Sequence, residues 1–212
     1  MPFAPKIAFV DLETTGTSPD RSRVTEVGVV LVTQAPGGAD RPPRVDHWSS
    51  LVNPGVAVPP SISVLTGITD RMLAGAPRFP DIAAALLERL EGAVFVAHQA
   101  RFDYGFLGRE FERAGLAFHA PTLCTVRLSR LLFPERSPHS LDAIIARFGL
   151  PVADRHRALG DARVLWEFVQ TLYRRLPRDV VEDAVRRLIR HPDPPADTAS
   201  RHVKPAVREA GR

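Results

Sequence analysis

Residues 7–16 read Ile-Ala-Phe-Val-Asp-Leu-Glu-Thr-Thr-Gly, an apolar run that ends in two acids. The composition of Ile7–Val10 is typical of a buried strand. Burying carboxylates such as Asp11 and Glu13 costs free energy unless a counter-charge pairs with them. Because side chains alternate along a strand, both acids project from one face, one pleat apart. The stretch predicts either a strand end whose acids lie in water or a pair of oxygen ligands for a cation.

The order of the other elements predicts an α/β fold. Strands are expected over residues 6–12, 25–33 and 45–52. Because no helix is expected between them, the three strands indicate an antiparallel meander. The elements expected after it are a helix with Ile82, Leu86 and Leu90 on one side, a strand over 93–96, a helix from about Asp103, a strand near Thr122, and helices over 126–132, 140–148, 159–176 and 178–190. This order indicates one mixed sheet covered by helices.

Length and composition indicate a globular protein with one domain. The chain has 212 residues, of which 44% are hydrophobic and 25% charged. We expect the domain to cover residues 1–190. Residues 191–212 contain four prolines and few apolar side chains, so we expect them to form a disordered tail.

Charge and cysteine content bear on partners and location. The net charge of +4 and the pI of about 9.9 favour a polyanionic partner such as nucleic acid. A single cysteine, Cys124, allows no internal disulfide and is compatible with a reducing cytoplasm. We see no apolar run long enough to span a bilayer and no signal sequence, so we expect a cytoplasmic protein without a membrane partner.

Two further acids lie at the starts of predicted helices. Asp103 stands four residues before Leu107, on the apolar face of its helix, and Asp161 stands four residues before Leu165. Each acid alone is compatible with a simple interaction with the helix macrodipole. Two such helices beside a strand with two acids favour a cluster of four carboxylates.

A cluster of this kind needs a counter-charge, because neighbouring carboxylates repel one another. Oxygen ligands suit Mg²⁺ or Mn²⁺, and two such ions about 3.5–4 Å apart can clamp a phosphodiester. His156 lies five residues before Asp161, and a histidine there is suited to take a proton from a bound water. The alternative for His156 is an ordinary exposed histidine.

These residues resemble a known family, the DEDDh 3′→5′ exonucleases, which includes the proofreading epsilon subunit of bacterial replicative DNA polymerase, oligoribonuclease and ribonuclease T. The three matching motifs are Asp11-x-Glu13, Asp103 preceded by His98, and His156-x4-Asp161. The resemblance extends from about residue 7 to residue 172. It implies a ribonuclease H-like fold, with a five-stranded mixed sheet flanked by helices.

The resemblance also implies two Mg²⁺ or Mn²⁺ ions and roles for the five motif residues. Asp11 would bridge both ions, Glu13 and Asp161 would complete the first site, and Asp103 would hold the second. His156 would be the general base for the attacking water.

The resemblance further implies contacts with the terminal nucleotide. The backbone at Leu12 and Thr14 would hold it, Leu65 and Phe106 would lie around its base, and His98 would lie near its sugar or phosphate. Core packing is the alternative for Leu65 and Phe106. Stacking against apolar side chains serves any base, which predicts little base preference.

The predicted function is a metal-dependent 3′→5′ exonuclease that releases nucleoside 5′-monophosphates from DNA 3′ ends, in replication proofreading or repair. Its substrate would be single-stranded DNA or a frayed 3′ end. One alternative is an RNA 3′-end trimming exoribonuclease, which recognition of the 2′-hydroxyl would distinguish. Others are a non-catalytic nucleic-acid-binding domain and a structural domain whose acids hold a cation. A free-standing enzyme and a DNA polymerase subunit are both compatible with the sequence.

Overall fold

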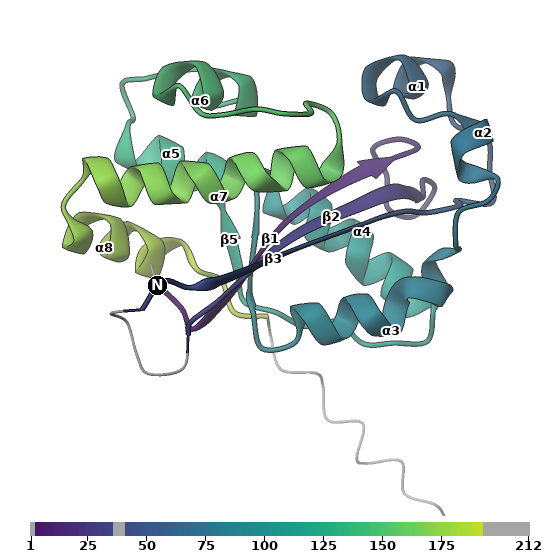
Figure 1. Cartoon of the computed structure of the whole chain (residues 1–212), viewed down its shortest axis with the longest axis horizontal. Coiled ribbons are helices and arrows are strands. Elements are labelled where there is room, and N and C mark those ends of the chain that lie inside the picture. The colour runs from purple at the N-terminus through teal and green to yellow at the C-terminus, as the bar shows by residue number, and fades with distance from the viewer. Residues whose placement is uncertain (1–2, 36–40, 193–212) are drawn as a thin grey trace, which may run out of the picture.

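The computed structural model describes residues 3–35 and 41–192. A five-stranded sheet with the order β3-β2-β1-β4-β5 forms its centre (Figure 1). The strands are β1 (Lys6–Thr14), β2 (Val24–Thr33), β3 (Arg44–Leu51), β4 (Val94–Ala97) and β5 (Thr122–Cys124). β1, β2 and β3 pair antiparallel, whereas β4 is parallel to β1 and to β5. The predicted meander and mixed sheet are confirmed.

Eight helices are present in the described residues. They are α1 (Pro60–Thr66), α2 (Asp70–Leu73), α3 (Phe79–Leu90), α4 (Ala100–Arg113), α5 (Thr125–Leu132), α6 (Leu141–Phe148), α7 (Ala158–Arg175) and α8 (Arg178–Leu188). α1 and α2 were not predicted, because each is too short to show a helical repeat of apolar residues. α4 begins three residues before the predicted start, which places Asp103 in its first turn. Among these described helices, none combines the length and apolar character that a membrane crossing requires.

Two cores lie on opposite faces of the sheet, and β1 contributes to both. Ile7 and Phe9 face the core shared with α5 to α8, whereas Ala8 and Val10 face the core shared with α3 and α4. The Phe9 ring lies 5.4 Å from the ring of Trp166 on α7. Because sides alternate along a strand, the residues two and four positions beyond Phe9 also point toward α7. Those residues are the acids of the first motif.

A close approach at Gly28 fixes where α7 begins. Gly28 pairs with Asp11 across β1 and β2. A Cβ at Gly28 would lie 2.2 Å from the backbone carbonyl carbon of Ala158, so only glycine allows the helix to start against the sheet here. The first turn of α7, which contains Asp161, therefore lies over the carboxyl end of β1.

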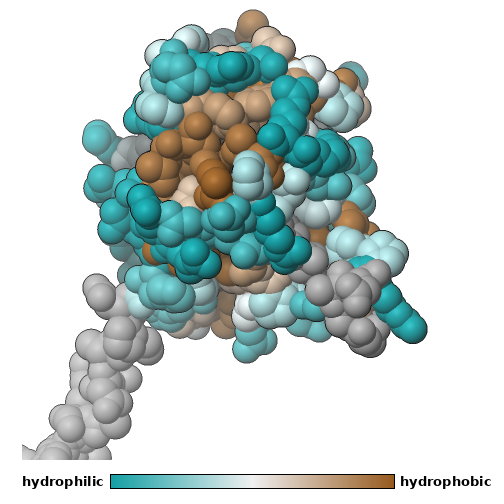
Figure 2. Space-filling model, turned by 90° about the vertical axis from the view of Figure 1, so that its left-hand side faces the viewer, coloured by the Kyte–Doolittle hydropathy of each residue, from teal (hydrophilic) through white to brown (hydrophobic). Residues whose placement is uncertain are grey.

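The opposite end of α7 lies away from this point. Arg175 lies fourteen positions beyond Asp161, a length of about 21 Å at the rise of an α-helix. On that side of the molecule Figure 2 shows apolar residues gathered in one area framed by hydrophilic ones. Past α8, Arg190 forms an isolated bridge with Thr122 of β5. The predicted tail, residues 191–212, lies outside the described residues apart from its first two.

Candidate active site

The structure brings the predicted acids together at the carboxyl end of β1. Carboxylate oxygens of Asp11, Glu13 and Asp161 lie within 4.8 Å of one another. Asp103 approaches from α4 on the other face of the sheet. Its charge contributes to the raised pKa of Asp11, and the backbone of Leu12 hydrogen bonds to it. One strand and the first turns of two helices thus position the four carboxylates.

Burial raises the pKa of every acid in the cluster, and repulsion by neighbouring acids adds to this for Asp11 and Glu13. For Asp11 the pKa rises well above the ordinary value because of desolvation and then the charges of Asp103, Asp161 and Glu13. Desolvation, followed by the Asp161 charge, raises the pKa of Glu13 to about 8. Burial raises the pKa of Asp103 to about 7 and also raises that of Asp161. Without a cation, the cluster therefore retains protons near neutral pH.

One fully buried oxygen of the cluster has no hydrogen-bond partner among the described residues. Asp161 Oδ1 is buried and makes no hydrogen bond, whereas Asp161 Oδ2 accepts one from Arg155. A buried oxygen without a partner is uncommon and costs free energy. Beside two further carboxylates, it fits a hard divalent cation with oxygen ligands. The donor set therefore suits Mg²⁺ or Mn²⁺.

His156 lies in the segment that leads into α7. Its backbone has a φ of 58°, a left-handed conformation that is uncommon for a residue other than glycine. The backbone of His156 hydrogen bonds to Asp161 and helps to lower the pKa of that acid, against the larger effect of burial. The predicted general base thus stands directly beside the acid cluster.

An ion pair with β2 anchors this segment. The Arg157 guanidinium donates to both oxygens of Glu26, at 3.1 Å from Nε and 2.6 Å from Nη2. The backbone N–H of Ala158 donates to the same carboxylate at 3.0 Å. Glu26 is only 4% exposed, so its charge is satisfied within the protein. These three hydrogen bonds tie the start of α7, and the neighbouring His156, to the sheet.

His98 directly follows β4. Its Nδ1 lies 3.0 Å from the hydroxyl oxygen of Thr125, and burial is the main cause that lowers its pKa to about 4. Its Nε2 is buried without a hydrogen-bond partner in the described part of the chain. The charge of Arg155 also lowers this pKa, which places His98 near the same guanidinium that contacts Asp161.

The other predicted substrate contacts differ in exposure. Leu12 and Thr14 are buried, and the Thr14 hydroxyl donates to the carbonyl of Gly16 at 2.7 Å. Leu65 on α1 is 54% exposed and therefore is not a core residue. Phe106 has no exposed surface and packs in the core, so core packing, the alternative interpretation, describes its environment in this structure.

The sequence interpretation missed the ion pairs around the site. Glu26 and Arg157 anchor the start of α7, and Arg155 joins Asp161 to Asp142 on α6. A signal for Glu26 was present, because it is the one charged residue in the otherwise apolar or uncharged strand β2. No local pattern indicates its partner, which lies 131 residues away in sequence.

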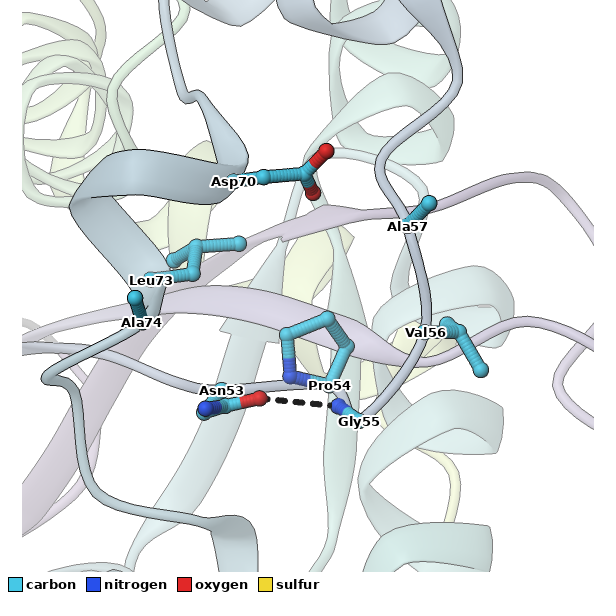
Figure 3. Close-up of a pocket in the computed structure, with 8 residues that line it drawn as sticks. All are labelled: Asn53, Pro54, Gly55, Val56, Ala57, Asp70, Leu73 and Ala74. Carbon is cyan, nitrogen blue, oxygen red and sulfur yellow. Dashed lines mark hydrogen bonds between the residues drawn. The ribbon is translucent and has the colours of Figure 1, made fainter.

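A hollow of about 290 Å³ lies between the loop after β3 and α2 (Figure 3). Its lining residues are Asn53, Pro54, Gly55, Val56, Ala57, Asp70, Leu73 and Ala74. Asn53 Oδ1 accepts a hydrogen bond from the backbone N–H of Gly55 at 2.9 Å, and Asp70 accepts one from Val58 at 2.9 Å. None of the clustered acids lines this hollow, so it is separate from the candidate active site.

The fold and the acid cluster define the class of protein as a ribonuclease H-like nuclease. Residues 8–169 match the model of the exonuclease family, and the chain belongs to that family. Members of this family are exonucleases, which hydrolyse phosphodiester bonds with divalent metal ions. The family resemblance found in the sequence and the expected fold are both confirmed.

Individual relatives agree with this membership. The DNA polymerase III subunit epsilon of Aquifex aeolicus is 34% identical over 165 residues, which cover 77% of this chain and 78% of that protein. The DNA polymerase III PolC-type of Clostridium perfringens is 29% identical over 178 residues, which cover 84% of this chain and 12% of that protein. Several curated relatives are much longer, and the chain spans only 11% to 22% of their length.

A solved structure shows the same fold. Exonuclease I of E. coli, in complex with a dT13 oligonucleotide, matches with a TM-score of 0.72 at 16% sequence identity. The match covers 82% of this chain and 42% of the other.

Proposed function

We propose that this chain removes nucleotides from DNA 3′ ends and releases nucleoside 5′-monophosphates, with two Mg²⁺ or Mn²⁺ ions as cofactors. The observation that carries the proposal is the cluster of Asp11, Glu13 and Asp161, with the buried unpartnered Oδ1 of Asp161 among them. Asp103 beside Asp11 supplies a fourth carboxylate. A cluster of carboxylates that needs positive charge, with a buried oxygen that lacks a hydrogen-bond partner among the described residues, is suited to metal-dependent phosphodiester hydrolysis.

Each acid has a role in holding the ions. Asp11, at the centre of the cluster, would contact both, Glu13 and Asp161 would complete one site, and Asp103 would hold the other. Once bound, such ions polarise the phosphodiester and stabilise the leaving 3′ oxygen. His156, beside Asp161, takes the proton from the attacking water.

Three other groups are proposed to hold the 3′ nucleotide. The Nε2 of His98, which has no hydrogen-bond partner among the residues that the structure describes, is suited to hydrogen bond with the sugar or phosphate. The exposed Leu65 offers an apolar surface for the base, and the backbone at Leu12 and Thr14 lies next to the acids. An apolar contact of this kind accepts any base, so trimming would show little sequence preference.

DNA is the proposed substrate because of the relatives. The Aquifex aeolicus relative is named as a DNA polymerase III subunit, and the E. coli exonuclease I structure contains a dT13 oligonucleotide. These likenesses support single-stranded DNA or a frayed 3′ end as substrate and proofreading or repair as the role. A DNA polymerase is the proposed protein partner.

The test uses a 5′-labelled single strand of DNA and an RNA of the same sequence, each with Mg²⁺, Mn²⁺ or EDTA. We expect a ladder that shortens from the 3′ end of the DNA with either ion and no product with EDTA. Asp161→Asn should give no ladder. The matched control Glu88→Gln, an exposed acid on α3, should behave as the wild type. Hydrolysis of RNA alone would overturn the DNA assignment, and no product from either strand would overturn the enzyme.

A further inference from the structure

The side chain of Arg155 contacts the acid cluster. Its Nη1 donates to Asp161 Oδ2, while its Nε and Nη2 lie 2.8 and 2.7 Å from Asp142 Oδ1. One guanidinium therefore joins an acid of the cluster to an acid outside it. The Arg155 side chain is 22% exposed and that of Asp142 is 71% exposed, so the outer half of this bridge lies at the surface.

The charge of Arg155 acts on three of the four acids of the cluster. It lowers the pKa of Asp11, Glu13 and Asp161, in each case against the larger effect of desolvation. In the absence of a metal ion, the guanidinium thus supplies part of the positive charge that the carboxylates need. This charge does not satisfy the cluster, because Asp161 Oδ1 still has no hydrogen-bond partner in the described part of the chain and the acids retain raised pKa values.

A divalent ion and this guanidinium compete for the same acid. The positive charges of the ion and of the guanidinium repel each other within one cluster. The hydrogen bond from Arg155 to Asp161 Oδ2 also weakens the binding of an ion to that carboxylate. The ion pair with Asp142 allows Arg155 to leave Asp161. If the Nη1 contact to Asp161 breaks, Nε and Nη2 remain on Asp142, so Arg155 keeps a partner after it leaves the cluster.

We propose that Arg155 is an internal competitor of the metal ion. Arg155 pairs with Asp161 in the metal-free protein and keeps only its contact with Asp142 when the ion binds. This inference rests on the proposed function, because it concerns the regulation of the same site. The consequence is a lower apparent metal affinity, since only the fraction of molecules with Asp161 released is competent to bind. The competitor also stabilises the metal-free fold by offsetting carboxylate repulsion.

The first test measures Mn²⁺ binding without substrate by titration calorimetry. Arg155→Gln removes the competitor, and we expect it to bind Mn²⁺ about tenfold more tightly than the wild type, as for the loss of one partly exposed charge-assisted hydrogen bond. The matched control is Arg163→Gln, an exposed arginine two residues beyond Asp161 that contacts His47 instead. It removes the same charge without touching the cluster and should change the affinity by less than about twofold.

Thermal unfolding gives a second readout that is independent of activity. In EDTA, Arg155→Gln should unfold at a lower temperature than the wild type, and saturating Mn²⁺ should remove that difference. Arg155→Lys keeps the charge but lacks the planar fork, so its Mn²⁺ affinity should lie between those of the wild type and Arg155→Gln. Equal affinities for Arg155→Lys and Arg155→Gln would contradict the competition.

The outcomes separate this inference from the proposed function. If the wild type binds Mn²⁺ and Arg155→Gln binds it no more tightly than Arg163→Gln, the competitor role is wrong and the metal site stands. If the wild type binds no Mn²⁺, the proposed metal-dependent function itself fails.

Discussion

The ion pair between Glu26 and Arg157 makes a prediction that can be worked through from the structure. Glu26 is 4% exposed and accepts three hydrogen bonds, two from Arg157 and one from the backbone of Ala158. Glu26→Gln keeps the shape of the side chain but removes its charge, and the new amide NH₂ then faces an N–H donor of Arg157 or Ala158. Breaking a buried ion pair costs about 3–5 kcal/mol when the remaining charge stays buried.

The remaining charge here does not stay buried, because the Arg157 side chain is 39% exposed and water can solvate it. We therefore expect Glu26→Gln to lower the free energy of unfolding by about 2 kcal/mol. Because Arg157 follows His156 directly, the same change should also slow single-turnover hydrolysis at saturating Mg²⁺.

Urea unfolding measured by tryptophan fluorescence checks this magnitude, with the slope against urea unchanged. Glu112→Gln is the matched control. It breaks an ion pair with Arg109 in which the two side chains are 66% and 48% exposed. Exposed pairs contribute about 0–1 kcal/mol, so the control should lose less than half as much stability. Equal losses for the two variants would refute the anchoring role of Glu26.

Four further predictions concern the cluster and its support. Gly28→Ala should lower the free energy of unfolding by about 1–3 kcal/mol, because its Cβ would meet the α7 backbone; unchanged urea unfolding would contradict the close approach. Asp11→Asn should abolish hydrolysis without lowering the unfolding temperature in EDTA, because it relieves carboxylate repulsion; near-normal turnover would remove Asp11 from the site. His156→Ala should slow the single-turnover rate by roughly 10²–10⁴-fold, and an unchanged rate at neutral pH would exclude it as the base. In EDTA, the unfolding temperature should fall as the pH rises from 4.5, the ordinary pKa of Glu13, to about 8, its pKa in the folded protein. Asp103, with a folded-state pKa of about 7, adds to the decline, because both acids are protonated more readily in the folded than in the unfolded chain; saturating Mg²⁺ should remove the decline.

The elements that carry the acids were predictable because their signals are local. β1 has a run of apolar residues with alternating sides, and α7 buries Leu165, Phe168, Val169 and Leu172 at helical spacing. Once those elements are fixed, alternation along the strand and the turn of the helix place Asp11, Glu13 and Asp161 toward one another.

What the sequence did not indicate depends on contacts between distant segments. The Glu26–Arg157 pair and the Arg155–Asp142 pair join different elements, and neither leaves a local pattern. α1 and α2 have few buried residues, so they show no apolar repeat. The sequence left Phe106 ambiguous for a related reason. A phenylalanine on a helix near a site can pack in a core or face a ligand, and its burial in the structure shows that Phe106 packs in the core.

The most direct measurement of the central claim is the anomalous scattering of crystals grown with Mn²⁺ and a nucleoside 5′-monophosphate. The account predicts two peaks about 3.5–4 Å apart at the carboxyl end of β1, both in contact with Asp11. Glu13 and Asp161 should bind one ion, and Asp103 should lie at the other. Peaks elsewhere on the molecule, or no peak among these four acids, would contradict it.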